Sequence, residues 1–323
     1  MKQPPRVPSQ SGAFPRSTTV DLAVSIGSLT LRNPIVTASG TFGSGLEYAN
    51  FVDIESLGAV VTKGVSPVPW PGNEGRRIAE TPSGMLNSIG LQNPGVERFA
   101  ETQLATLREV APEATVIVNV VGHTADEYRQ VVERLESEPN VAAYELNVSC
   151  PNLEEGGMAF GVSCPSIEAI TRGCRAVTSR PIIVKLTPNV TDITETARAA
   201  ESAGADAVSL INTLLGMAID LKTMRPVLRR VVGGLSGPAI KPVALRMVWE
   251  TSKAVDIPII GMGGAVTGED VVEFMLAGAS AVAIGTANFT DPTATAKALN
   301  GLVHFCENRN IHSVASLIGS LEV

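Results

Sequence analysis

Short apolar runs recur along the chain, and each ends in a polar residue or a glycine before a longer amphipathic stretch begins. Near-continuous Val and Ile runs of this length are typical of strands that are buried on both faces, as parallel sheets require. Eight such runs are found, at 33–40, 59–65, 116–122, 144–150, 181–188, 206–213, 257–264 and 280–286. The pattern therefore predicts eight parallel strands that alternate with helices.

The stretches between these runs predict the helices. The segment 124–138 begins with Thr124, a good N-cap, and its apolar residues fall on one side of a helix: Tyr128, Val131, Val132 and Leu135. Similar patterns cover 191–203, 241–254 and 267–277. Eight alternating units favour a (β/α)8 TIM barrel over a doubly wound sheet, and hence the α/β class.

Three further segments are expected to elaborate the barrel. Residues 20–32 alternate around an Ile-Gly-Ser turn, which predicts an N-terminal β-hairpin on the barrel floor. Long connections follow the second strand (66–92) and the sixth strand (214–239). Inserted loops at the carboxyl ends of barrel strands usually carry function, so we expect these two to form part of a site.

Composition fits one large domain. The chain has 323 residues, 44% of them hydrophobic, which is enough for a single barrel core over 19–323. Residues 1–18 are rich in Pro, Ser, Gln and Arg, and we interpret them as a disordered leader without a signal peptide or membrane anchor. The net charge of −7 argues against nucleic acid and against an anionic membrane as the main partner.

Cysteine usage points to a reducing compartment. The four cysteines form no CxxC pair, so we expect reduced thiols, a cytoplasmic location and no metal or iron–sulfur site in this chain.

Two glycine clusters predict a phosphate site. The seventh strand ends in Gly261-Met262-Gly263-Gly264 and the eighth in Ile284-Gly285-Thr286. Phosphate groups bind to TIM barrels at the loops after these two strands, where glycines let backbone N–H groups approach an anion. One cluster alone would indicate a turn; two on these strands favour a phosphorylated ligand.

Polar residues at the strand ends indicate what kind of ligand the barrel mouth would bind. Lysine and asparagine are poor choices for a buried parallel strand, and each alone could be a satisfied core or rim residue. Together they converge on the mouth of one barrel: Lys63, Asn119, Asn147, Lys185, Asn212 and Thr213. Two lysines and several amides, with no Asp/Glu pair, suit an anionic ligand rich in hydrogen-bonding groups.

Cys150 is the candidate reactive residue, because it follows the fourth strand in a polar turn beside Ser149 and Pro151. A free cysteine is usually an inert apolar filler, but its place at this end of a barrel favours chemistry. No histidine is an obvious partner, His123 being the nearest candidate, so a general base fits the surrounding residues better than a Cys–His nucleophile.

Several motifs resemble the class 1 dihydroorotate dehydrogenases, which are flavin enzymes of pyrimidine biosynthesis. They are VTKG (61–64), NSIGLQNPG (87–95), NVSCPN (147–152), VKLTPN (184–189), INT (211–213), GLSGPAIKPVALR (234–246) and GMGG (261–264). The resemblance extends over about residues 20–309. NSIGLQNPG and GGMAFG (156–161) are similar to subclass B, whose catalytic subunit pairs with an iron–sulfur flavoprotein.

The resemblance implies a role for each matching residue. FMN contacts would come from Ser39, Lys63, Gly64, Asn119, Asn147, Lys185, Ile211, Gly237, Gly263, Gly264, Gly285 and Thr286, the last four at the phosphate. Substrate contacts would come from Lys63, Asn87, Ser88, Ile89, Gly90, Leu91, Asn147, Asn152, Asn212 and Thr213. Cys150 would remove the C5 proton of (S)-dihydroorotate while FMN N5 accepts the C6 hydride, which yields orotate.

The resemblance also implies a partner. The sequence has neither a cysteine cluster nor a GxGxxG unit, so electrons would reach NAD through a second subunit that carries FAD and an iron–sulfur cluster. A homodimer of catalytic chains would form the core of a heterotetramer. The alternatives are a fumarate-linked subclass A enzyme, a dihydropyrimidine dehydrogenase acting on an uncharged ring, a lyase or aldolase with a Schiff base on Lys63 or Lys185, and a non-catalytic binding subunit.

Overall fold

An eight-stranded parallel sheet lies at the centre of the computed structural model, which describes residues 18–149 and 160–323. Its strands are β3 (Ile35–Thr37), β4 (Val60–Val61), β7 (Val116–Val120), β8 (Val141–Asn147), β9 (Ile182–Lys185), β10 (Ala207–Leu210), β15 (Ile259–Met262) and β16 (Ala281–Ile284). Each overlaps one of the predicted strands, and β8 begins earlier than predicted. The eight-strand prediction is confirmed.

The sheet closes into a barrel. Its strand order is β3-β16-β15-β10-β9-β8-β7-β4, so β3 and β4 are the two ends that must meet. They do meet: Thr37 N donates to Ala59 O at 3.2 Å, and Val61 N donates to Thr37 Oγ1 at 2.9 Å. Closure puts the carboxyl ends of all eight strands at one mouth.

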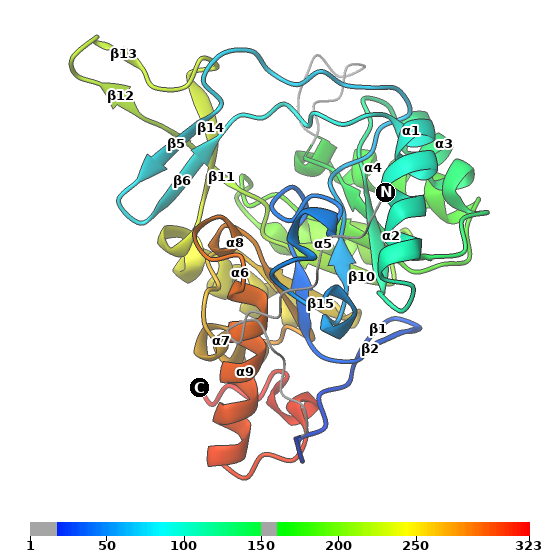
Figure 1. Ribbon diagram of the computed structural model, residues 1–323, viewed down its shortest axis with the longest axis vertical. Helices are drawn as coiled ribbons and strands as arrows, with labels where there is room; N and C mark the ends of the chain where they lie inside the picture. The colour runs from blue at the N-terminus through cyan, green and yellow to red at the C-terminus, as the bar shows by residue number, and fades with distance from the viewer. Residues whose placement is uncertain (1–17, 150–159) are drawn as a thin grey trace.

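Helices surround the barrel (Figure 1). They are α1 (Val96–Arg98), the π-helix η3 (Phe99–Leu104), α2 (Ala105–Val110), α3 (Ala125–Leu135), α4 (Cys164–Arg175), α5 (Ile193–Ser202), α6 (Lys241–Ser252), α7 (Gly268–Leu276), α8 (Ala287–Thr290) and α9 (Ala294–Asn308). Short 3-10 turns are η1 (Leu46–Tyr48), η2 (Ile54–Ser56), η4 (Phe160–Val162), η5 (Pro238–Ile240) and η6 (Val314–Leu317). The connection from β3 to β4 contains η1 and η2 in place of a full α-helix.

The predicted amphipathic helix at 124–138 forms as α3. Thr124 Oγ1 accepts a hydrogen bond from Glu127 N at 3.2 Å, which satisfies an unpaired N–H of the first turn. The four apolar residues expected on one side, Tyr128, Val131, Val132 and Leu135, are fully buried against the barrel. Helix periodicity and the N-cap were therefore sufficient to place this helix.

The N-terminal hairpin is also confirmed. β1 (Val24–Ile26) and β2 (Leu29–Leu31) pair antiparallel around Gly27. Ile26 and Leu31 are fully buried in the main core. Gly27 packs against Asp206 at the start of β10, so the hairpin lies at the amino-terminal end of the strands, opposite the mouth.

The two long connections pair with each other in an insert sheet at the mouth. It consists of β5 (Ile78–Thr81), β6 (Gly84–Asn87), β11 (Leu214–Met217) and β14 (Val232–Ser236), in the order β11-β14-β6-β5. A small hairpin of β12 (Ile219–Asp220) and β13 (Arg225–Pro226) projects beyond it (Figure 1). Sequence patterns predicted functional connections here but not that β6 and β14 would pair across so long a separation.

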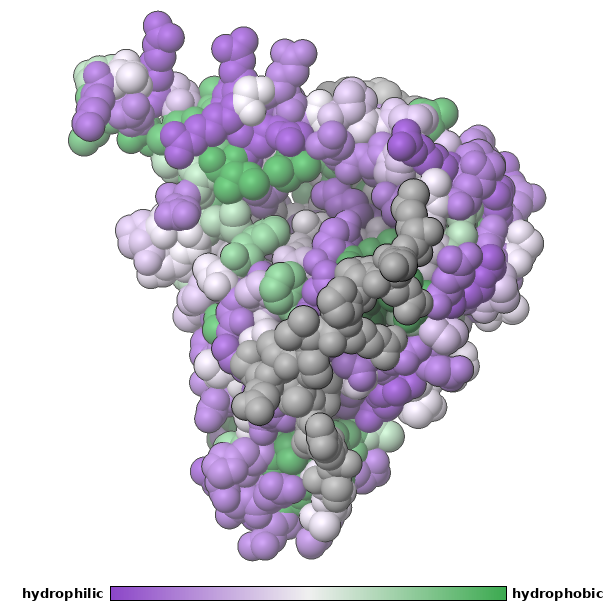
Figure 2. Space-filling view, in the orientation of Figure 1, coloured by the Kyte–Doolittle hydropathy of each residue, from purple (hydrophilic) through white to green (hydrophobic). Residues whose placement is uncertain are grey.

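Exposed hydrophobic side chains gather on and around this insert sheet. They include Ile78, Leu215, Met217, Ile219, Leu221, Met224, Val231 and Val232. Figure 2 shows hydrophobic surface in this region, beside a hollow in the molecule. Within the described residues, the helices are all too short or too polar to cross a bilayer.

Candidate active site

A cavity of about 530 Å³ opens at the carboxyl ends of the barrel strands, between the mouth and the insert sheet. Nearly all of the predicted site residues line it. They are Ser39, Lys63, Gly64, Asn87, Ser88, Ile89, Gly90, Leu91, Asn119, Asn147, Lys185, Ile211, Asn212, Thr213, Gly237, Gly263, Gly264 and Gly285. Residues from both long connections thus reach the same space as the strand ends.

Three predicted residues stand apart from that set. Thr286 is not at the cavity wall, but its hydroxyl donates to Ser236 Oγ at 2.9 Å, and Ser236 lines the cavity. Cys150 and Asn152 lie outside the described residues, so their roles stay predictions.

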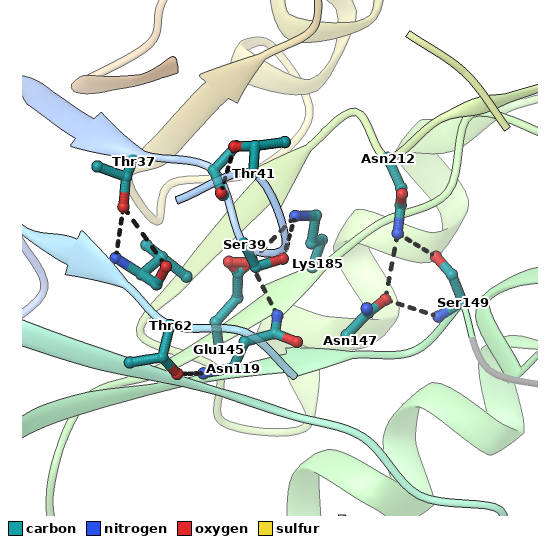
Figure 3. Close-up of polar contacts among 12 residues, drawn as sticks. Thr37, Ser39, Thr41, Thr62, Asn119, Glu145, Asn147, Ser149, Lys185 and Asn212 are labelled. Atoms are coloured by element: carbon teal, nitrogen blue, oxygen red, sulfur yellow. Dashed lines mark hydrogen bonds and ion pairs between the residues drawn. The ribbon is translucent and has the colours of Figure 1, made fainter. Parts of the chain in front are cut away.

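One polar network lies in the wall of the cavity and beneath it (Figure 3). The Lys185 ammonium donates to Ser39 Oγ at 3.1 Å and lies 3.4 Å from Glu145 Oε1. Asn119 Nδ2 donates to the same carboxylate oxygen at 3.3 Å. The network therefore joins β7, β8, β9 and the end of β3, and it holds an ion pair inside the barrel.

A second network orients the amides across the cavity (Figure 3). Asn212 Nδ2 donates to Asn147 Oδ1 at 3.2 Å and to Ser149 Oγ at 2.9 Å. The backbone is held as well, because Tyr128 donates its hydroxyl proton to Asn147 O at 2.7 Å. These bonds fix which edge of each amide faces a ligand and place Ser149 at the rim.

Lys63 carries a charge that no carboxylate offsets within the described residues. Its ammonium lies beside Gly40 at the cavity wall. Burial lowers the pKa of Lys63, and the nearby positive charges of Lys185 and Arg77 lower it further. An anionic ligand would relieve this repulsion, so the site is electrostatically suited to one.

The glycine clusters at the strand ends leave room that a side chain would occupy. Gly263 and Gly264 have φ angles of +123° and +87°, which L side chains rarely adopt. A Cβ on Gly264 would lie 2.7 Å from Gly237 O, so these loops approach each other within contact distance. The loops present backbone, not side chains, at this end of the cavity, which is how phosphate groups are usually bound.

Glu145 is the site-associated residue that the sequence interpretation missed. It lies in the middle of β8 in a run that is otherwise mostly apolar, and 2% of its side chain is exposed. A charged residue in a buried parallel strand is as unusual as the lysines and asparagines that were singled out, so the same signal could have found it.

No cluster of His, Cys, Asp and Glu suited to a metal ion occurs among residues 18–149 and 160–323. Burial raises the pKa of each described cysteine thiol: that of Cys174 rises to about 12, and those of Cys164 and Cys306 rise as well. A raised pKa disfavours the thiolate, so these three cysteines are poor candidates for acid–base chemistry.

The fold is a TIM barrel, and its mouth combines two ammonium groups with glycine loops, features that suit an anionic ligand with a phosphate group. Comparison with known proteins identifies which family of such barrels this is. The family model for dihydroorotate dehydrogenase matches residues 21–306. The chain belongs to this family, which confirms the resemblance that its motifs indicated.

The chain is also similar to individual members over nearly its full length. A protein of Alkaliphilus oremlandii is 54% identical over 301 residues, which cover 93% of this chain and 99% of that protein. A protein of Trichlorobacter lovleyi is 54% identical over 301 residues, with 93% and 98% covered. A protein of Bacteroides thetaiotaomicron is 52% identical over 303 residues, with 94% and 99% covered. Each is named dihydroorotate dehydrogenase B (NAD(+)), catalytic subunit.

Proposed function

We propose that this chain oxidises (S)-dihydroorotate to orotate with FMN, as the catalytic subunit of an NAD-linked dihydroorotate dehydrogenase of pyrimidine biosynthesis. The observation that carries the proposal is the single cavity in which the glycine loops, two lysines and four asparagines meet. The near full-length similarity to catalytic subunits of that name supports it.

The described residues fit FMN. Gly263 and Gly264, with Gly285 and Thr286 of the next strand, would hold the phosphate on backbone N–H groups. The side-chain oxygen of Asn119 is buried without a hydrogen-bond partner among the described residues, as expected of an acceptor that awaits a ligand N–H. Lys185, Asn147 and Ser39 would face the flavin ring. When bound, FMN supplies a hydride acceptor.

The remaining polar groups fit dihydroorotate. The unpaired Lys63 ammonium would bind the substrate carboxylate, together with the loop from Asn87 to Leu91 that the insert sheet holds over the cavity. Asn212 and Asn147 would donate to and accept from the polar edge of the pyrimidine ring. This arrangement favours an acidic pyrimidine over an uncharged one.

Cys150 would act as the base that removes the C5 proton. Support comes from its neighbour: Ser149 lies at the cavity rim and accepts a hydrogen bond from Asn212. The chain would thus place Cys150 next to the same amides that bind the ring, and Asn152 would complete the substrate contacts. A thiolate is required for proton removal, so the site must favour that form of Cys150.

The electrons would leave through a second subunit that carries FAD and an iron–sulfur cluster and reduces NAD. The name shared by the relatives, catalytic subunit, supports a partner. The exposed hydrophobic side chains of the insert sheet are of the kind that protein contacts cover, which supports an assembly with other chains. The core of that assembly would be a homodimer of catalytic chains. We place the complex in the cytoplasm.

The test compares two substrates under anaerobic conditions. The FMN-loaded chain should be yellow, and dihydroorotate should bleach the flavin whereas dihydrouracil, which lacks the carboxylate, should not. Cys150→Ser should keep FMN but be reduced far more slowly, and Cys164→Ser serves as the matched control with native rates. Equal bleaching by both substrates would contradict the proposed specificity, and a full reduction rate in Cys150→Ser would remove that residue from the mechanism.

A further inference from the structure

Glu145 and Asn147 lie on the same face of β8, because side chains alternate along a strand. Asn147 reaches the cavity, whereas Glu145 lies one layer deeper, inside the barrel. The intervening Leu146 and the preceding Tyr144 point the other way; Tyr144 bonds Glu136 Oε2 outside the barrel at 3.2 Å. Glu145 is therefore a carboxylate directly under the floor of the site.

Within the described part of the chain, the side chain of Glu145 makes polar contacts with two groups, and both belong to residues that line the cavity. Its Oε1 lies 3.4 Å from Lys185 Nζ and accepts from Asn119 Nδ2 at 3.3 Å. The side chains of Glu145 and Lys185 are 2% and 5% exposed, so water does not screen the pair. Glu145 therefore acts on the cavity through Lys185 and Asn119, which line it.

Stability alone does not account for this ion pair. Removing two charges from water is costly, and apolar residues of similar size often replace a buried pair without loss of stability. The charge balance of the cavity offers a reason. Two ammonium groups, of Lys63 and Lys185, line it, and Glu145 is the one described carboxylate in ion-pair contact with either.

We propose that Glu145 is a positioning residue that fixes the Lys185 ammonium at the cavity wall and offsets its charge. The inference rests on the proposed function, because the charge that Glu145 controls is the one that faces the flavin. The negative charge of Glu145 partly cancels the positive potential that Lys185 exerts on the flavin. Reduced flavin is more negative than oxidised flavin, so removal of the Glu145 charge would stabilise the reduced form relative to the oxidised form.

The test replaces Glu145 with an uncharged group of the same shape and measures the flavin midpoint potential, not the turnover. In Glu145→Gln we expect FMN to bind and the preference for reduced over oxidised FMN to rise on the order of tenfold. For a two-electron couple this corresponds to a rise of about 30 mV. Glu145→Asp, which keeps the charge, should stay closer to the native potential.

Glu136→Gln is the matched control, because this carboxylate also lies next to β8 but outside the barrel, against Tyr144 and Thr178. It should leave the potential unchanged. A native potential in folded, flavin-loaded Glu145→Gln would overturn the proposal. If the native protein binds no FMN, or if dihydroorotate does not reduce its FMN, the proposed function fails. If the native protein passes both tests but the midpoint potential of Glu145→Gln equals the native value, only the inference about Glu145 is overturned.

A second pair of variants covers the case in which Glu145→Gln does not fold. Lys185→Gln leaves Glu145 as an unpaired buried carboxylate, whereas the Glu145→Gln/Lys185→Gln double variant removes both charges. The proposal predicts a lower midpoint potential in the single variant than in the double variant. Because a buried carboxylate without a partner tends to bind a proton, the two potentials are compared at alkaline pH. Equal potentials there would show that the Glu145 charge does not act on the flavin.

Discussion

Replacing Gly264 with alanine tests the proposed phosphate site at one atom. The backbone at this residue has a φ of +87°, and L residues in the left-handed region lose about 1–2 kcal/mol of stability. The new Cβ would also lie 2.7 Å from Gly237 O and 3.0 Å from Lys241 N, which is closer than carbon atoms normally approach. The loop that would carry the phosphate must therefore move.

The expected loss of FMN affinity follows from that movement. If one backbone N–H no longer reaches the phosphate, the lost charged hydrogen bond is worth about 1.5–3 kcal/mol. That corresponds to an FMN dissociation constant roughly 10–150 times higher. Titration of the apoprotein with FMN, followed by flavin fluorescence, measures this constant directly.

Gly204→Ala is the matched control. Gly204 has a similar φ of +94°, but its nearest neighbours are carbon atoms of Arg175 at 3.7 Å, an ordinary contact. It also precedes β10, at the end of the barrel opposite the mouth. This variant should lose stability in thermal unfolding but bind FMN like the native chain. Equal FMN affinities in native, Gly264→Ala and Gly204→Ala proteins would refute the phosphate assignment.

Three further predictions concern the polar residues and the thiols. Asn212→Ala removes the amide that would bind the substrate ring and that orients Asn147 and Ser149. Two neutral hydrogen bonds from this amide to the ring, at about 1 kcal/mol each, would make the rate of flavin reduction at low dihydroorotate fall roughly 30-fold in stopped-flow measurements; a native rate would exclude the amide from substrate binding. The pKa of Lys63 is lowered in the folded chain from its ordinary value of 10.5. Between the lowered pKa and 10.5 the unfolded chain binds more protons than the folded chain, so this residue makes the stability of the apoprotein rise with pH in that range. Lys63→Met should lose that contribution, which melting curves of both apoproteins at several alkaline pH values would measure. The same dependence of melting temperature on pH in both proteins would contradict the prediction. Iodoacetamide should modify Cys150 before Cys164 or Cys174, since burial raises the pKa of the latter two thiols, and orotate should protect it; peptide mass spectrometry that finds Cys174 modified first would contradict this.

Most of the barrel was predictable because its signals are local. A strand that is buried on both faces must be apolar along its length, so β9 and β10 are evident from Ile182–Lys185 and Ala207–Leu210 alone. The same holds for α3, whose cap and apolar side lie within one segment. Chain order and the rules for parallel strands then determine the topology.

The insert sheet was less predictable because its pairing is not local. β6 and β14 are short, and the register that aligns Asn87 with Gly234 depends on two loops meeting above a barrel that is already closed. No turn motif specifies such a pairing. The sequence could therefore indicate that both connections matter for function, but not that they form one sheet over the cavity.

The residues that line the cavity were predictable where each departs from the character of its strand. Lys185 and Asn119 stand out in Val/Ile-rich runs, and both line the cavity. Glu145 stands out in the same way but was not predicted, because it lies inside β8 and the predicted residues were those at the strand ends, where a ligand binds. The role of Cys150 stays a prediction.

The central claim is tested most directly by anaerobic titration of the FMN-loaded chain with dihydroorotate, with the flavin absorbance and the orotate formed recorded together. The account predicts that the flavin is fully bleached and that orotate appears in an amount equal to the flavin reduced. Orotate formed without bleaching, or a flavin that stays oxidised in excess dihydroorotate, would contradict it.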